Sequence, residues 1–135
     1  MQLQEAITPS KLDKRPTVAI GHIQLLVSDV SKATDFFIRL GLRYIHQSED
    51  IAILELRGGT HLILKQAKRY IMTAGTKAPF DLMVDNIVAT RNACISNGLF
   101  PSPIEKNQVH SQFIISSPDG YLITIISSHT NGRIV

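Results

Sequence analysis

The sequence predicts an α+β fold made of two copies of one β-α-β-β-β unit, because strand and helix patterns follow one another in that order twice. The landmarks of the two copies recur at a nearly constant offset of about 55–60 residues. The matching landmarks are Asp29 with Asp85, Gly41-Leu42 with Gly98-Leu99, and Gly58-Gly59 with Asp119-Gly120. Neither copy can bury its sheet face alone, so we expect the two sheets to join around a shared concavity.

The first strand, over residues 20–27, separates two kinds of side chain. Alternation places His22, Gln24 and Leu26 on one face and three aliphatic side chains on the other. The aliphatic face suits a packed core, and the face of His22 suits the wall of a half-polar cavity. Ser28-Asp29 then stops the strand and offers side-chain oxygens that can cap a helix.

Apolar spacing and turn residues indicate the rest of the first unit. A helix is predicted over residues 30–40, and Gly41 ends it because glycine readily adopts a positive φ. Strands follow at 42–46, 51–56 and 60–65, separated by turns at 48–50 and 57–59.

The same order returns after a mostly polar linker, and Asp85-Asn86 is the predicted cap of the second helix. The predicted elements are a strand at 80–84, a helix at 87–96 that ends at Asn97-Gly98, a strand that begins over 99–103, and two strands at 108–116 and 121–127. Turns are predicted at 105–107 and 117–120. The predicted organisation is a leader over 1–17 and one domain over 18–135, with modules at about 19–66 and 80–128 joined by a linker at 67–79.

The composition limits the classes of protein to consider. With 135 residues and 44% hydrophobic content, the chain has the material for one globular domain. Its apolar runs are of strand length and its N-terminal stretch lacks the apolar core of a signal peptide, so we expect a cytoplasmic protein with no membrane partner. The single cysteine, Cys94, excludes an internal disulfide and is expected in the core. A net charge of +3 without a nucleic-acid motif predicts no nucleic-acid partner.

Several of these motifs together resemble the vicinal oxygen chelate superfamily, which includes glyoxalase I, extradiol dioxygenases, and fosfomycin and bleomycin resistance proteins. The residues that carry the resemblance are His22 to Asp29, Asp35-Phe36-Phe37, Leu40-Gly41-Leu42, Val84-Asp85-Asn86 and Ser117-Pro118-Asp119-Gly120-Tyr121. The resemblance spans residues from about 19 to 128. It implies that the two βαβββ modules form an incomplete eight-stranded barrel, the glyoxalase/bleomycin-resistance/dioxygenase-like fold, often within a homodimer. This scaffold serves isomerases, dioxygenases, transferases and plain binders, so the resemblance does not predict one activity.

The metal-dependent members of the superfamily bind a divalent ion through inward-facing residues on the first and fourth strands of each module. Carried over to this sequence, these positions fall at His22, near Ile63, at or near Pro79, and at Thr124. Only His22 can ligate a metal, whereas a catalytic centre needs about three protein ligands. We therefore expect no standard metal site and no cofactor. The alternative is a displaced divalent-metal site that joins His22 with His61 and Glu55.

Polar residues on inward strand faces are the expected wall of a ligand cavity. They are His22, Gln24, Glu55, His61, His110 and Thr124. An equally weighted alternative for His22 is a wall or core histidine whose ring is satisfied by a backbone carbonyl. For Gln24 and Thr124, a hydrogen bond to a neighbouring residue explains the side chain as well as a ligand does.

Three hypotheses for the function follow. The preferred one is a homodimeric protein that binds a small, largely apolar organic molecule without the standard metal site. The second is a metal-dependent enzyme, either a glyoxalase-like lyase or isomerase or a ring-cleaving dioxygenase of the extradiol type, with a displaced metal on His22. The third is a drug-binding resistance protein of the bleomycin-binding type, whose cationic ligands would match a slightly basic chain with few aromatic residues poorly. The sequence leaves open whether the protein is an enzyme.

Overall fold

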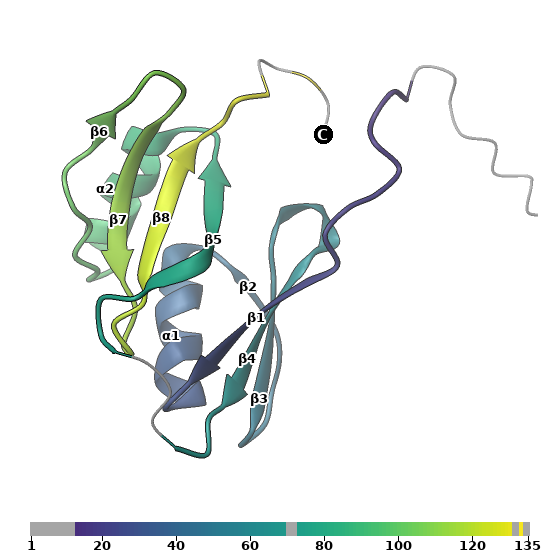
Figure 1. The fold of residues 1–135 in the computed structure, drawn as a ribbon, viewed down its shortest axis with the longest axis vertical. Coiled ribbons are helices and arrows are strands. Elements are labelled where there is room, and N and C mark those ends of the chain that lie inside the picture. Colours follow the sequence, from purple (N-terminus) through teal and green to yellow (C-terminus); the bar gives the residue numbers. More distant parts are fainter. Residues whose placement is uncertain (1–12, 70–72, 131–132, 134–135) are drawn as a thin grey trace, which may run out of the picture.

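Two four-stranded mixed sheets, each accompanied by one helix, make up the protein in the computed structural model (Figure 1), which describes residues 13–69, 73–130 and 133. The two modules follow each other along the chain, as the sequence predicts, and the predicted α+β fold class is confirmed. No helix in these described ranges is long and apolar enough to span a membrane.

The first module forms a sheet in the order β1-β4-β3-β2, in which β1 runs parallel to β4 and the other neighbours are antiparallel. Its elements are β1 (His22–Val27), α1 (Val30–Leu40), β2 (Arg43–Gln47), β3 (Ile51–Glu55), the 3₁₀ turn η1 (Arg57–Gly59) and β4 (His61–Gln66). The predicted helix has the observed bounds, and each predicted strand differs by at most two residues at either end.

The caps of α1 explain why its bounds could be predicted. The Asp29 side chain accepts a hydrogen bond from the backbone N–H of Lys32 at 3.0 Å, which satisfies one of the free donors of the first turn. At the other end Gly41 has φ 128°, and its N–H donates to the carbonyls of Phe37 and Ile38. Both signals are local in sequence, so they act wherever the helix lies in the fold.

The second module repeats the topology in the order β5-β8-β7-β6, with β5 parallel to β8. Its elements are β5 (Lys77–Val84), α2 (Ile87–Ser96), β6 (Glu105–Lys106), β7 (Ser111–Ser116) and β8 (Leu122–Ser127). The predicted cap is confirmed, because the Asn86 side chain accepts a hydrogen bond from the backbone N–H of Ala89 at 2.9 Å.

The third strand of the second module differs from the prediction. Residues 99–103 form no strand, and β6 occupies Glu105–Lys106, where a turn was predicted. The two prolines of that segment, Pro101 and Pro103, have no N–H for a strand ladder. Ser102 replaces part of the ladder, because its N–H donates to the Ile114 carbonyl at 2.9 Å and its hydroxyl accepts from the Ile114 N–H at 2.8 Å.

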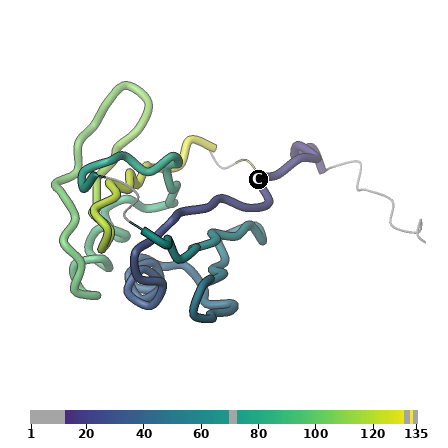
Figure 2. Tube along the Cα trace, turned by 60° about the horizontal axis from the view of Figure 1, so that its bottom comes forward, coloured from purple at the N-terminus to yellow at the C-terminus, as the bar shows by residue number. Residues whose placement is uncertain are grey.

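Two further boundaries differ. β5 begins at Lys77 and so takes up the last residues of the predicted linker, with a register irregularity between Lys77 and Asp81 around Pro79. β7 begins at Ser111 instead of residue 108, because residues 107–110 form a turn in which the Asn107 N–H donates to the His110 carbonyl. Residues 1–12 of the predicted leader lie outside the described residues, and residues 13–17 contain no helix or strand and lie outside both sheets (Figure 2).

One apolar core runs through both modules. The largest fully buried side chains include Phe37 of α1, Leu54 and Leu62 of the first sheet, and Phe113 and Ile125 of the second sheet. α1 packs on β3 and β4, and α2 packs on β7 and β8. Both views show α1 on the side of the first sheet that faces the second module (Figures 1 and 2). The modules therefore meet through their aliphatic sides and their helices, and this packing determines which residues can line a site between them.

Candidate site between the modules

The first sheet carries three of the predicted site residues in one row. The register pairs His22 of β1 with His61 of β4, and His61 with Glu55 of β3. The predicted separation of faces in β1 is confirmed: Leu25 and Val27 are buried, whereas His22 and Gln24 are exposed. The polar face is thus open in the single chain, although we expected it to face a concavity shared by the two sheets. The reason is that α1 and the second module pack on the opposite face.

His22 and His61 lie side by side, with ring centroids 5.8 Å apart and ring planes at 51°. Glu55, the third member of the row, is bound elsewhere: its carboxylate accepts from the Arg43 Nε at 2.7 Å and lies 2.5 Å from Nη2. Within the described ranges there is no group of three or more His, Cys, Asp or Glu side chains that could hold a metal ion. The structure thus brings together the two imidazoles of the alternative metal site, whereas the Glu55 carboxylate of that site is paired with Arg43.

The donor set of the superfamily's standard metal site does not fit this chain. Ile63 is a buried aliphatic residue and Pro79 offers no side-chain donor. Thr124 is 7% exposed, and its register partner on β5 is Asp81. His22 is therefore the one strong ligand among the four positions, and two or more further ligands would have to come from elsewhere.

His110, which the sequence placed in the same cavity, lies in the second module with a different neighbour. Its Nδ1 is 3.1 Å from the Ser127 carbonyl oxygen, and its ring centroid is 5.1 Å from that of His129. His110 and Thr124 thus belong to the second module, whereas His22, Gln24 and His61 belong to the first. That these six residues contact one ligand stays a prediction.

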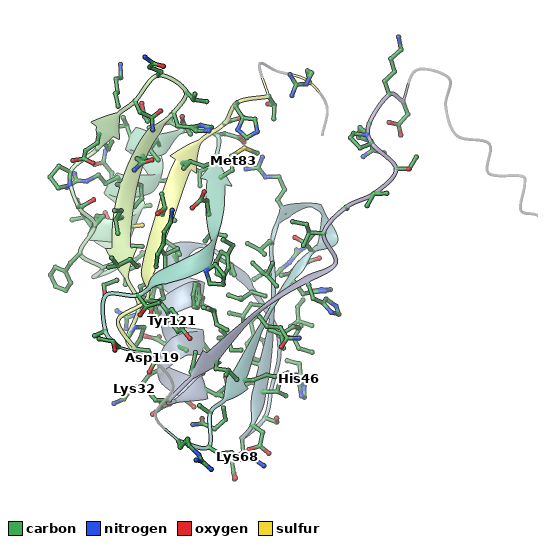
Figure 3. The ribbon with its side chains drawn as sticks, viewed as in Figure 1. Lys32, His46, Lys68, Met83, Asp119 and Tyr121 are labelled. Carbon is green, nitrogen blue, oxygen red and sulfur yellow. The ribbon has the colours of Figure 1, made fainter. Side chains whose placement is uncertain are left out.

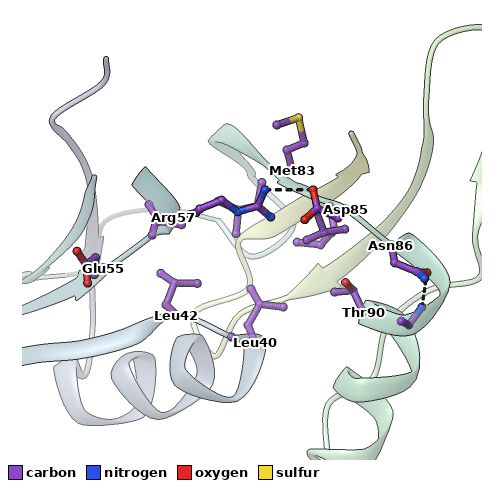
Figure 4. A pocket seen from close by; sticks show the side chains of 14 residues that line it. Leu40, Leu42, Glu55, Arg57, Met83, Asp85, Asn86 and Thr90 are labelled. Carbon is purple, nitrogen blue, oxygen red and sulfur yellow. Dashed lines mark hydrogen bonds and ion pairs between the residues drawn. The ribbon is translucent and has the colours of Figure 1, made fainter. Parts of the chain in front are cut away.

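Two adjoining cavities lie between the modules. The smaller has a volume of about 430 Å³ and lies between the C-terminal end of α1, the end of β3 and the start of α2 (Figure 4). The larger has a volume of about 750 Å³, with Ile23, Phe80 and His129 in its wall. Four residues line both cavities: Leu56, Arg57, Leu82 and Met83. We call these two cavities together the inter-module groove.

Of the six residues predicted to line a ligand cavity, Glu55 alone lines the groove. The first strand contributes Ile23, which points to the face opposite His22. Sequence reasoning missed Arg57 and Asp85, which it treated as a turn residue and a capping residue. In the structure the Arg57 Nη1 lies 3.1 Å from the Asp85 Oδ1 and bridges the modules across the groove (Figure 4). No local pattern could have shown this pairing, because it depends on how the modules pack.

The Arg57–Asp85 ion pair is a weak link. The Arg57 side chain is 60% exposed and the Asp85 side chain 75% exposed, and ion pairs so exposed contribute about 0–1 kcal/mol to stability. The guanidinium can therefore exchange its partner at little cost. Most of the remaining wall of the smaller cavity is aliphatic and includes Leu40, Leu42 and Val84.

Cys94 and Tyr121 have raised pKa values and lie outside the groove. Burial raises the pKa of the Cys94 thiol, which is 1% exposed, so the predicted core position of Cys94 is confirmed. Burial, and secondarily the charge of Asp119, raises the pKa of Tyr121. Tyr121 holds the modules together, because its hydroxyl donates to the Leu26 carbonyl at 2.9 Å. Tyr121 and Asp119 are labelled at the junction of the two modules in Figure 3.

No family model matches the chain, and no curated protein matches it either. Solved structures do match its fold. Lactoylglutathione lyase from Agrobacterium tumefaciens has a TM-score of 0.69 at 15% identity, over 88% of this chain and 100% of that one. A glyoxalase/bleomycin resistance protein/dioxygenase from Alicyclobacillus acidocaldarius has 0.67 at 14% identity, over 90% and 99%.

A putative glyoxalase family protein from Bacillus anthracis has a TM-score of 0.66 at 14% identity, over 85% of this chain and 98% of that one. At these identities the likeness concerns the fold and leaves the activity open. The chain therefore has the fold of the glyoxalase/bleomycin-resistance/dioxygenase proteins, in agreement with the resemblance of its motifs to the vicinal oxygen chelate superfamily.

Proposed function

We propose that the protein binds a small, largely apolar organic molecule in the inter-module groove, without the standard metal site of the superfamily. The observation that carries the proposal is the pair of adjoining cavities of about 430 and 750 Å³ with a common wall. Volumes of about 300–1,000 Å³ with mostly apolar walls and a few polar groups are typical of small-molecule sites.

Arg57 is the proposed polar anchor. Arg57 lines both cavities, so a ligand in either cavity lies next to Arg57. Its guanidinium presents several N–H donors in one plane, which suits a carboxylate, carbonyl or phosphate oxygen of the ligand. Since the ion pair with Asp85 is exposed, a ligand oxygen can replace that carboxylate with little loss.

A neutral fluorescent probe tests the proposal directly. The chain contains no tryptophan, so Met83→Trp both fills the common wall and introduces a single fluorophore there. We expect N-phenyl-1-naphthylamine to bind the wild-type protein and to bind Met83→Trp at least about tenfold more weakly. Val88→Trp is the matched control, because Val88 is 56% exposed on α2 and lines neither cavity. The proposal is contradicted if the probe does not bind the wild-type protein, or if it binds both variants with equal affinity.

A second candidate is the metal-dependent enzyme, and the 5.8 Å approach of the His22 and His61 rings favours it. It needs at least one more ligand, and Glu55 can supply it only by leaving Arg43. Turnover of a glutathione hemithioacetal or a catechol that is abolished by a chelator and by His22→Ala supports this candidate. No turnover with nickel, zinc, manganese and ferrous ions each supplied would rule it out.

The expected homodimer is also a proposal. The open face of the first sheet exposes Leu26 to 48%, in the same strand as exposed His22 and Gln24, and a second copy would cover this face. Light scattering after size exclusion is expected to give twice the chain mass of 15.0 kDa, and Leu26→Glu is expected to lower it. A wild-type protein that stays monomeric at high concentration contradicts the dimer.

A further inference from the structure

The second module brings two histidines together at the ends of adjacent strands. His110 immediately precedes β7, and His129 follows β8 by two residues. β7 and β8 are antiparallel neighbours, so the start of one lies beside the end of the other. The two ring centroids are 5.1 Å apart and the ring planes stand at 65°. His129 is exposed and His110 is half-buried, so the pair is open to solvent.

The His110 ring is held in the tautomer that a metal ligand requires. Its Nδ1 lies 3.1 Å from the Ser127 carbonyl oxygen, and because a carbonyl can only accept, Nδ1 carries the proton. The lone pair of Nε2 is then available to a metal ion. A histidine ligand whose other ring nitrogen donates to a carbonyl is the usual arrangement in metal sites, where this hydrogen bond fixes the ring orientation.

The turn before β7 fixes the His110 backbone as well. The Asn107 side chain accepts from the His110 N–H at 2.7 Å, while the Asn107 N–H donates to the His110 carbonyl at 2.8 Å. A ligand that is oriented before binding loses less conformational freedom on binding.

The separation of the rings fits one shared ion. Zinc lies about 2.0–2.1 Å from an imidazole nitrogen, so two imidazoles in tetrahedral positions have their ring centroids about 5.2 Å apart. The His110–His129 distance of 5.1 Å agrees with this value, whereas the His22–His61 distance of 5.8 Å requires a wider angle at the metal.

We propose that His110 and His129 form a binding site for one late first-row divalent cation, Zn²⁺, Ni²⁺ or Cu²⁺. Imidazole nitrogens favour these ions over Mg²⁺ and Ca²⁺, which prefer oxygen ligands. Two protein ligands leave further coordination positions to water, so the ion exchanges with solution. His129 lines the larger cavity, so the ion lies at the wall of the groove. The site is in the second module, whereas His22 and His61 are in the first, and it does not depend on the proposed organic ligand.

Calorimetric titration of the untagged protein with Zn²⁺ and Ni²⁺, with Mg²⁺ as the negative ion, tests the site. We expect one ion per chain, and at least about tenfold weaker binding in His110→Ala and in His129→Ala. His46→Ala is the matched control and should bind as the wild type does, because His46 is exposed on β2 and belongs to neither histidine pair. Binding that survives both His110→Ala and His129→Ala, binding that is lost in His22→Ala, or no binding in the wild type would each overturn the proposal. The second of these results would instead support the metal-dependent enzyme.

A measurement without substitutions guards against variants that fail to fold. Substoichiometric Cu²⁺ broadens the NMR signals of the imidazoles nearest to the bound ion. We expect the ring signals of His110 and His129 to disappear first among the five histidines of the chain. Earlier loss of the His22 and His61 signals contradicts the proposal.

Discussion

Asp119 joins the two modules at the end of β1, and its removal gives the sharpest test of how they are held together. Its carboxylate accepts from the Ser28 backbone N–H at 3.0 Å and from the Ser28 hydroxyl, 91 residues away in the sequence. A hydrogen bond to a charged group contributes about 1.5–3 kcal/mol when sheltered. Ser28 and Asp119 are both accessible to solvent, so water compensates for part of the hydrogen-bond energy that the substitution removes. We expect Asp119→Ala to lower the free energy of unfolding by about 2 kcal/mol.

Urea unfolding followed by circular dichroism measures this change, and a thermal scan should show a fall in Tm of roughly 8 °C for a chain of this size. Asp35→Ala is the control, since it also removes one carboxylate and breaks an exposed i,i+4 pair with Arg39. That pair should contribute less than about 0.5 kcal/mol. If Asp119→Ala is no less stable than Asp35→Ala, the contact does not hold the modules together and the reasoning is refuted.

Three further outcomes are expected. Thr34 is 3% exposed and its hydroxyl has no hydrogen-bond partner among the described residues, so Thr34→Val should raise the free energy of unfolding by about 1 kcal/mol in urea; a loss of stability would mean that the hydroxyl is bonded. Burial and Asp119 raise the folded-state pKa of Tyr121 above its unfolded value. The contribution of the Tyr121 hydroxyl to the free energy of unfolding is therefore complete below about pH 10 and is lost as the pH rises through the folded pKa. Tyr121→Phe should therefore lose less stability at alkaline pH than the wild type. Cys94 is buried with a raised thiol pKa, so Ellman's reagent at pH 8 should modify it only after unfolding; rapid modification of the native protein would contradict its core position.

Local signals explain what the sequence could predict. The caps at Asp29 and Asn86 and the positive-φ glycine at position 41 act within a few residues, and both helices have the predicted bounds. Period-two alternation in β1 likewise separates buried Leu25 from exposed Gln24. The position of β6 was predicted wrongly because the prolines at 101 and 103 lack the N–H that strand pairing needs, so pairing begins later in the chain. The Ser102 hydroxyl replaces a backbone hydrogen-bond partner there, and no apolar pattern reveals this arrangement.

The candidate site escaped sequence reasoning for a different reason. Its walls come from the ends of β3, β5 and α1, and these meet only because the modules pack through their helices. Arg57 and Asp85 each sit in a short polar stretch that is equally typical of an ordinary turn or cap. Their pairing is a property of module placement, for which the sequence offers landmarks of the repeat but no contact between its copies.

The single chain leaves two places for an organic ligand, and protein concentration distinguishes them. A ligand in the inter-module groove touches one chain, so its Kd does not depend on how much protein is dimeric. A ligand between His22 and Gln24 of one chain and a covering second copy would bind the dimer alone, and its apparent affinity would rise as dimers form. We expect the Kd of N-phenyl-1-naphthylamine to agree within about twofold at roughly 1 and 100 µM protein. If the affinity instead increases tenfold over this range and Leu26→Glu weakens it, the ligand binds on the open face of the first sheet. His22 and Gln24, which alternation in β1 first indicated, would then be the ligand-binding residues.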